Sequence, residues 1–266
     1  MKQKTLFDEE NRLELLSQLG DPLEILNRVI KWEKFRSVLN QGCRKEDTGK
    51  GGRPPYDVVM MFKILVLQRL YNLSDDQTEY QINDRMSFMR FLGINLCEKV
   101  PDAKTIWKFK NDLAETETVD KLFCMFDEHL ENKGLISHKG TIVDATFVDA
   151  PRQRNSRDEN KKIKNGVIPE EWEKPENKSK LAQKDIDADC TKKNGERHFG
   201  YKDHVKRDAD SKLITNYRVT SSSVHDSQRC VVFIGQEDEG LYADSAYSGK
   251  PLALALPENC KNQKCE

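Results

Sequence analysis

Residues 140–151 read GTIVDATFVDAP, and this stretch organises the rest of the chain. Thr141, Ile142 and Val143 are β-branched, and a glycine and a proline bound the segment, so we predict a buried strand. Asp144 interrupts the apolar run. Because a carboxylate inside a buried strand is costly unless a cation or strong donors face it, we expect Asp144 to have a partner. An aspartate at a strand end, bonded to the backbone, is the simpler alternative.

Residues 240–249 read GLYADSAYSG and form a second short apolar run that leads into an aspartate, Asp244. Two strands that each deliver a carboxylate indicate one shared site for a divalent cation. Oxygen ligands of this kind suit Mg²⁺ or Mn²⁺ rather than zinc. From the residues alone, this metal site and two structural aspartates remain equal alternatives.

The composition indicates a polar protein with room for one large domain or two modest ones. The chain has 266 residues, of which 36% are hydrophobic and 33% charged, so a sizeable core is available. Its net charge of −1 argues against wholesale coating of nucleic acid but allows a local basic face. No apolar run approaches the ~20 residues of a membrane span, and the N-terminus lacks a signal-peptide core. We therefore expect a cytoplasmic protein with no membrane partner.

The first half of the chain has helical periodicity. Residues 57–71 are apolar on nearly every side, which predicts a helix at the centre of a bundle. Ser74 and Gln77 form a capping box for the next helix, and further short helices follow up to residue 132. Their tight turns are compatible with a helix-turn-helix, although spacing alone favours a plain bundle. The period changes at Gly140, so we expect a helical domain over residues 1–135.

A long polar tract, residues 152–197, follows the first strand. It has few aliphatic residues, so we expect a solvated loop, disordered or ordered only on a partner. A basic cluster within it could contact phosphates; its members are Arg152, Arg154, Arg157, Lys161, Lys162 and Lys164.

The second half alternates like a sheet. Residues 198–206 and 213–220 have the pattern of paired strands across a turn at 208–211. Residues 228–234 are a predicted helix, and the strand that leads into Asp244 follows. The fold class is therefore α+β, with an all-α domain followed by an α/β domain over residues 136–266.

The order strand with Asp, hairpin, helix, strand with Asp is the first part of a ribonuclease-H-like fold. The chain resembles bacterial insertion-sequence transposases of the DDE type, in the IS-five group. The likeness rests on several stretches in the same order: GRPPYDVVMMFKILVLQRLYNLSDDQTEYQINDRMSFMRFLGI, VPDAKTIWKFKNDL, GTIVDATFVDAP, KKNGERHFGYKDHVKRDADSKLI, VTSSSVHDSQ and LYADSAYSG.

The resemblance implies that Asp144 and Asp244 are the first two catalytic acids and metal ligands, with Mg²⁺ or Mn²⁺ as cofactor. Such enzymes cut DNA and join it by metal-assisted phosphoryl transfer. The third acid of the family is a Glu on a later helix. Glu258 and Glu266 lack the surrounding pattern of that helix. We therefore expect a truncated chain with an incomplete sheet, an exposed sheet edge and no transposition by itself.

The resemblance also implies DNA as partner, both element ends and target, and a homo-oligomer on DNA at the nucleoid. Arg53 and Lys202 lie in the quoted stretches and complete the predicted DNA contacts, which are Arg53, Arg152, Arg154, Arg157, Lys161, Lys162 and Lys202. The main alternative is a DNA-binding remnant that regulates without cutting. A nuclease or phosphatase unrelated to transposition would need a third ligand of its own.

Overall fold

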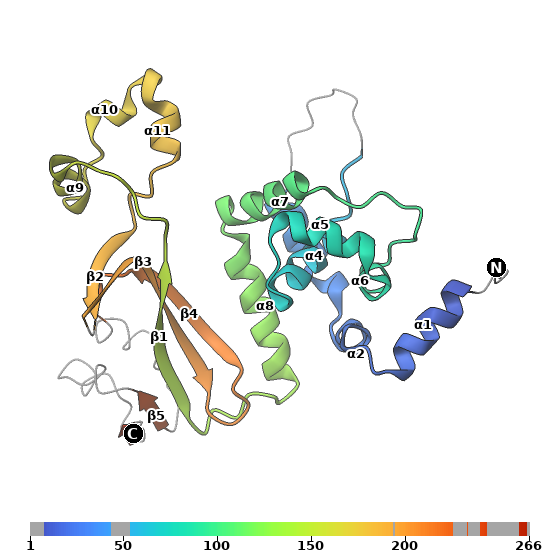
Figure 1. The fold of residues 1–266 in the computed structure, drawn as a ribbon. Coiled ribbons are helices and arrows are strands. Elements are labelled where there is room, and N and C mark those ends of the chain that lie inside the picture. Colours follow the sequence, from blue (N-terminus) through green and yellow to red (C-terminus); the bar gives the residue numbers. More distant parts are fainter. Residues whose placement is uncertain are drawn as a thin grey trace. The chain divides into compact units, whose positions relative to one another are not determined.

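A computed structural model describes residues 8–43, 54–193, 195–225, 233, 240–243 and 261–264. The chain divides into a helical unit, Met1–His129, and a sheet unit, Leu130–Glu266 (Figure 1). The sequence places the boundary near residue 135.

The helical unit consists of short helices joined by tight turns. Its elements are α1 (Asp8–Gln18), α2 (Pro22–Val29), η1 (Trp32–Phe35), α3 (Arg36–Gly42), α4 (Val58–Leu70), α5 (Asp75–Asp84), α6 (Met86–Leu92), α7 (Ala103–Glu115) and α8 (Thr118–Asn132).

Helix α4 lies at the centre of this bundle, as its apolar sequence predicts. Ile64 and Leu67 are fully buried, and the helix contacts α3, η1, α5, α6 and α7. The predicted capping box is present, because Ser74 and Gln77 each bond the other's backbone at the start of α5. A helix-turn-helix role for these elements stays a prediction.

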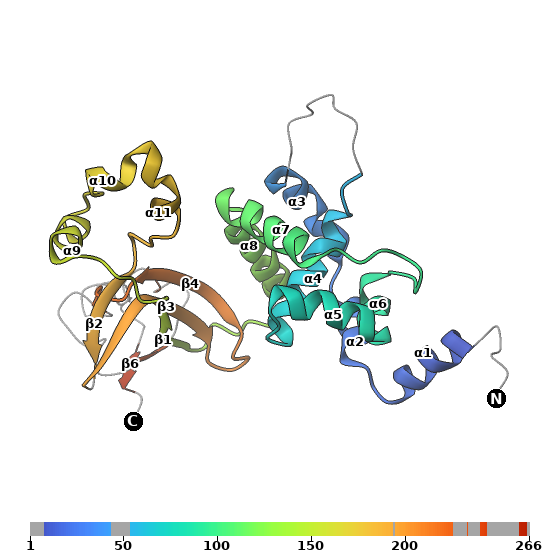
Figure 2. The same ribbon diagram turned by 45° about the horizontal axis from the view of Figure 1, so that its top comes forward.

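The sheet unit is built on a mixed six-stranded sheet (Figures 1 and 2). Its strands are β1 (Thr141–Asp149), β2 (Asp189–Lys193), β3 (Glu196–Asp208), β4 (Ile214–Ser221), β5 (Gly240–Ala243) and β6 (Lys261–Lys264). Strand β3 runs antiparallel to β1, β2 and β4, whereas β5 is parallel to β1 and β6 is parallel to β5. The predicted strand at β1, the β3–β4 hairpin and the strand before Asp244 are thus confirmed. Of the predicted helix 228–234, only Phe233 lies among the described residues, and it is buried.

The sheet corrects one expectation. Residues 261–264 pair with residues 240–243 as a further parallel strand, β6, so β5 is not the edge left by a missing strand. The prediction of an incomplete sheet is therefore wrong at this point.

Strands β2 and β4 share one edge of the long strand β3, end to end. Gly200 lies at their junction, where it pairs with Asp189 of β2 on one side and Asp149 of β1 on the other. Its φ of +146° is unfavourable for other residues, and a Cβ at this position would collide with the carbonyl oxygen of Val148. Glycine is required here because three strands crowd one backbone position.

Candidate functional site

The candidate site is centred on the parallel pair β1 and β5. Val143 of β1 is the register partner of Ala243, the last residue of β5. Asp144 follows Val143, and Asp244 follows Ala243 in the sequence. Asp244 itself lies outside the described residues, so its distance from Asp144 stays a prediction.

Asp144 is exposed, not buried as its apolar flanks predict. One carboxylate oxygen, Oδ1, accepts a hydrogen bond of 2.8 Å from the amide of Ala145. Because the side chain is exposed, a cation is not needed to offset a cost of burial at Asp144.

Asp203 of β3 projects from the same face of the sheet as Asp144. The register pairs Asp144 with Val205 and Thr146 with Asp203, and side chains two residues apart along a strand share a face. The Oδ1 atom of Asp203 is buried and has no hydrogen-bond partner. Burial raises the pKa of Asp203, and the neighbouring His204 partly offsets this effect.

The opposite face holds Lys202, one of the predicted DNA contacts. Its side chain is only 8% exposed, and its ammonium donates a 2.8 Å hydrogen bond to the carbonyl of Val224. The same ammonium lies 5.3 Å from the ring centroid of Phe147. His204 on the same face is fully buried, with Nε2 3.0 Å from the hydroxyl of Thr220. Lys202 is thus engaged inside the sheet unit.

The polar tract is folded, contrary to the expectation of a solvated loop. It contains α9 (Arg157–Lys164), α10 (Glu170–Glu173), η2 (Pro175–Asn177) and α11 (Lys178–Ala182), followed by β2 (Figure 2). Trp172 is fully buried, and its indole Nε1 donates to Glu159 at 2.8 Å. The ammonium groups of Lys180 and Lys184 lie 5.3 and 5.2 Å from the Trp172 ring centroid. One aromatic side chain therefore supplies the core that the composition does not predict.

Glu159 anchors this small core electrostatically. Hydrogen bonds from the Ser156 backbone and from Trp172 hold the pKa of Glu159 at about 2, so the group is ionised at neutral pH. Ser156 and Glu159 also form a capping box at the start of α9.

Basic side chains gather on this insertion. A cleft of about 420 Å³ is lined by Arg152, Arg154, Lys180 and Lys184. Asp185 also lines it, but its carboxylate already accepts from the hydroxyl of Tyr201. On α9 three further predicted DNA contacts are exposed, namely Arg157, Lys161 and Lys162. Arg53, the remaining predicted contact, lies outside the described residues.

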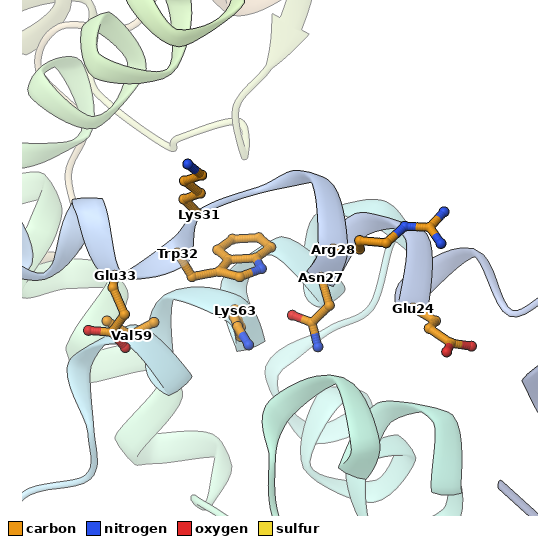
Figure 3. A pocket seen from close by; sticks show the side chains of 8 residues that line it. All are labelled: Glu24, Asn27, Arg28, Lys31, Trp32, Glu33, Val59 and Lys63. Atoms are coloured by element: carbon orange, nitrogen blue, oxygen red, sulfur yellow. The ribbon is translucent and has the colours of Figure 1, made fainter. Parts of the chain in front are cut away.

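A pocket of about 630 Å³ on the helical unit has mixed charge (Figure 3). Lys63 lies over the rings of Trp32 and Phe91 and donates to the Phe91 carbonyl at 3.1 Å. Burial lowers the pKa of Lys63. The lining residues are Glu24, Asn27, Arg28, Lys31, Trp32, Glu33, Val59 and Lys63. Because acids and bases both line it, the pocket has no clear charge preference.

Two absences hold for the part of the chain that the structure describes. No group of three or more His, Cys, Asp or Glu side chains converges there in a way that could hold a metal ion. No helix in the same residues is long and apolar enough to cross a membrane.

Two family matches cover most of the chain. Residues 10–112 match the family described as a transposase domain (DUF772), and residues 136–263 match the family described as a transposase DDE domain. No solved structure matches the chain significantly. The first match lies on the helical unit and the second on the sheet unit. The chain therefore has the domain composition of a DDE transposase of an insertion sequence.

Proposed function

We propose that this chain is the transposase of an insertion sequence, which binds the element ends and whose DDE domain serves divalent-metal-dependent cleavage and strand transfer of DNA. The third acid that the resemblance implies is not assigned to a residue, so we expect no complete strand transfer by this chain alone. Asp144 and Asp244 are the proposed catalytic acids and metal ligands. The observation that carries the proposal is the register of β1 and β5, in which Val143 and Ala243, the residues before the two acids, are partners. Each aspartate is one peptide bond beyond that pair, and parallel strands lie only about 4.8 Å apart.

The strand order supports a ribonuclease-H-like sheet for this chemistry. From β4 the order runs through β3 and β1 to β5 and β6, with the first two pairings antiparallel and the last two parallel. This order agrees with the fold that the sequence resemblance implies.

DDE domains generally use a divalent metal, and the donors here suit one. Asp144 is exposed, and an orphaned carboxylate oxygen of Asp203 lies on the same face. Carboxylate oxygens are the ligands that Mg²⁺ and Mn²⁺ prefer. When bound, such ions stabilise the negative charge of the transferred phosphoryl group. Asp144 lies within β1 and Asp244 follows β5 in the sequence, so a rigid sheet would hold the metal ligands in place for the DNA phosphate.

The DNA contacts that we propose are the exposed cations of the insertion, together with Arg53. Arg152 and Arg154 line the basic cleft, and Arg157, Lys161 and Lys162 lie on α9. Lys202 is left out of this set because its ammonium is engaged inside the sheet unit. We further propose that the chain acts as a homo-oligomer on DNA, at the nucleoid, since two element ends must be brought together.

The test compares Asp144→Asn with Asp149→Asn, which alters an exposed carboxylate on the same strand but on the other face. Labelled element-end DNA is incubated with each protein and Mn²⁺, and Mn²⁺ binding is measured by calorimetry. We expect Asp144→Asn to lower cleavage by about 10²–10³ and to weaken Mn²⁺ binding, with DNA binding retained. Asp149→Asn should behave like the unchanged chain. DNA binding without Mn²⁺ binding or cleavage in the unchanged chain would favour a non-catalytic regulator instead.

A further inference from the structure

Asp203 and Asp144 are diagonal neighbours on one face of the sheet. Asp203 pairs with Thr146, which is two residues after Asp144 on β1. Diagonal neighbours across an antiparallel pair lie about 7–8 Å apart at the backbone and somewhat closer at Cβ. Two aspartates at this separation can reach one ion between them, because each metal–oxygen bond adds about 2.0–2.1 Å.

The hydrogen bonding of Asp203 differs from that of a structural carboxylate on the same strand. Asp208 is 2% exposed, and its oxygens accept from the amides and hydroxyls of Ser137 and Ser211 and from the amide of His138. Asp203, by contrast, has a buried Oδ1 that no donor meets. No ion pair involves Asp203 within the described ranges.

An unmet buried acceptor costs about 1–3 kcal/mol, and more when the group is charged, so it needs an explanation. A metal ion is one of the few ligands that satisfies a carboxylate oxygen without a hydrogen. The unmet oxygen belongs to a side chain on the face of Asp144. Asp144 is itself exposed, and its Oδ1 accepts from the adjacent amide of Ala145.

We propose that Asp203 is a further ligand of the divalent cation that Asp144 and Asp244 hold. Three neighbouring strands would then each contribute one carboxylate: β5 through the residue that follows it, β1 through Asp144 and β3 through Asp203. This inference rests on the proposed function and assigns to the same site a residue that lies outside the pair of acids in the DDE resemblance.

The experiment titrates the full chain with Mn²⁺ by calorimetry and electron paramagnetic resonance. The variants are Asp203→Asn, Asp203→Glu and Asp144→Asn, with Asp149→Asn as the control. We expect Asp203→Asn to weaken Mn²⁺ binding by about tenfold or more, and Asp203→Glu, which keeps a carboxylate, to retain more of the affinity. The control should leave binding unchanged.

Thermal unfolding without metal separates ligation from a structural role. Removal of an orphaned charge should leave the Tm of Asp203→Asn equal to or above that of the unchanged chain. Unchanged Mn²⁺ affinity in Asp203→Asn, alongside reduced affinity in Asp144→Asn, would overturn this inference and leave the proposed function intact. If Asp203→Asn does not fold, two other variants decide. A Mn²⁺ affinity of Asp203→Ser equal to that of the unchanged chain would overturn this inference, and so would complete loss of Mn²⁺ binding in Asp203→Glu. An unchanged chain that binds no Mn²⁺ would overturn both proposals.

Discussion

Three aspartates of the sheet unit show how position decides the chemistry of one residue type. Asp208 is buried and fully bonded, Asp203 has a buried oxygen without a donor, and Asp144 is exposed. The residue type alone does not distinguish them. The environment thus separates a fully bonded structural carboxylate from one with an unmet oxygen and from one that is exposed.

Asp208 should stabilise the protein in a pH-dependent way. Burial alone would raise its pKa, but hydrogen bonds from Ser211 and Ser137 outweigh this effect and bring the pKa down to about 2. In the unfolded chain the pKa of an aspartate is about 3.9. Asp208 therefore adds on the order of 2 kcal/mol to the free energy of unfolding, and this contribution is complete above that pH. It is lost as the pH falls toward about 2, because the unfolded chain takes up the proton first.

Asp208→Asn should therefore lower the free energy of unfolding at pH 7, where an amide NH₂ would also face the donors of Ser211. Urea denaturation at pH 7 and at lower pH measures the effect. The difference between the two proteins should shrink on acidification, and a constant difference would contradict the assigned pKa. Asp210→Asn, in the turn that follows, serves as the control.

The sequence identifies Asp144 as a candidate metal ligand, but it does not identify Asp203 as one. An acid that interrupts a β-branched run is a pattern of neighbouring residues, so the sequence alone singles out Asp144. Asp203 lies in an alternating segment, and alternation shows only which residues of that strand share a face. The register with β1, which pairs Asp203 with Thr146, depends on where the chain returns after the insertion. No local pattern contains that information.

Among the elements, helix starts are the most predictable and the insertion is the least. Capping is a contact within a few residues. The predicted box at Ser74 forms at the start of α5, and Asp21 caps α2 by accepting from the amide of Leu23. The insertion contains few apolar residues, so its composition indicates a loop. It folds because Trp172 is surrounded by Glu159 and two lysine side chains, which come from separate elements of the insertion.

Trp172→Ala should unfold the insertion without unfolding the sheet. Truncation of a fully buried tryptophan typically costs about 3–5 kcal/mol, and no other large side chain of the described insertion is fully buried. Hydrogen exchange should show reduced protection over residues 157–182, with β1 and β3 unaffected. Val167→Ala changes an exposed side chain of the same insertion and should have no such effect. An equal drop of protection in the sheet would mean that the two are not separable.

Strand β6 marks another limit of pattern analysis. Its residues read KNQK, which has no apolar alternation, so the sequence gives no sign of a strand there. The pairing partner, β5, is what makes residues 261–264 a strand.

At the scale of the whole molecule, DNA binding should depend on the charge of the insertion, because the total charge is only −1. Replacement of Arg152 and Arg154 by Gln should weaken binding to DNA of any sequence. It should also reduce the slope of log K against log salt by about 0.9 for each phosphate that is no longer neutralised.

The matched control replaces two exposed lysines of the same unit, Lys133 and Lys139, by Gln. Fluorescence anisotropy over a range of salt concentrations measures both slopes. Equal slopes in the two double variants would show that any weakening follows net charge and not the basic cleft. A fragment of residues 1–135, which keeps α8 whole, should bind element ends if sequence recognition lies in the helices.

The junction at Gly200 makes the insertion a removable cassette. Its chain departs at Ala150, whose amide bonds the carbonyl of Phe199, and returns at Asp189, which pairs with Gly200. Entry and exit thus flank the same position of β3 on its two sides, about 10 Å apart by strand spacing. A linker of a few residues could close that gap without unthreading any strand. The insertion should therefore be open to shortening or exchange without a change in the strand order of the sheet.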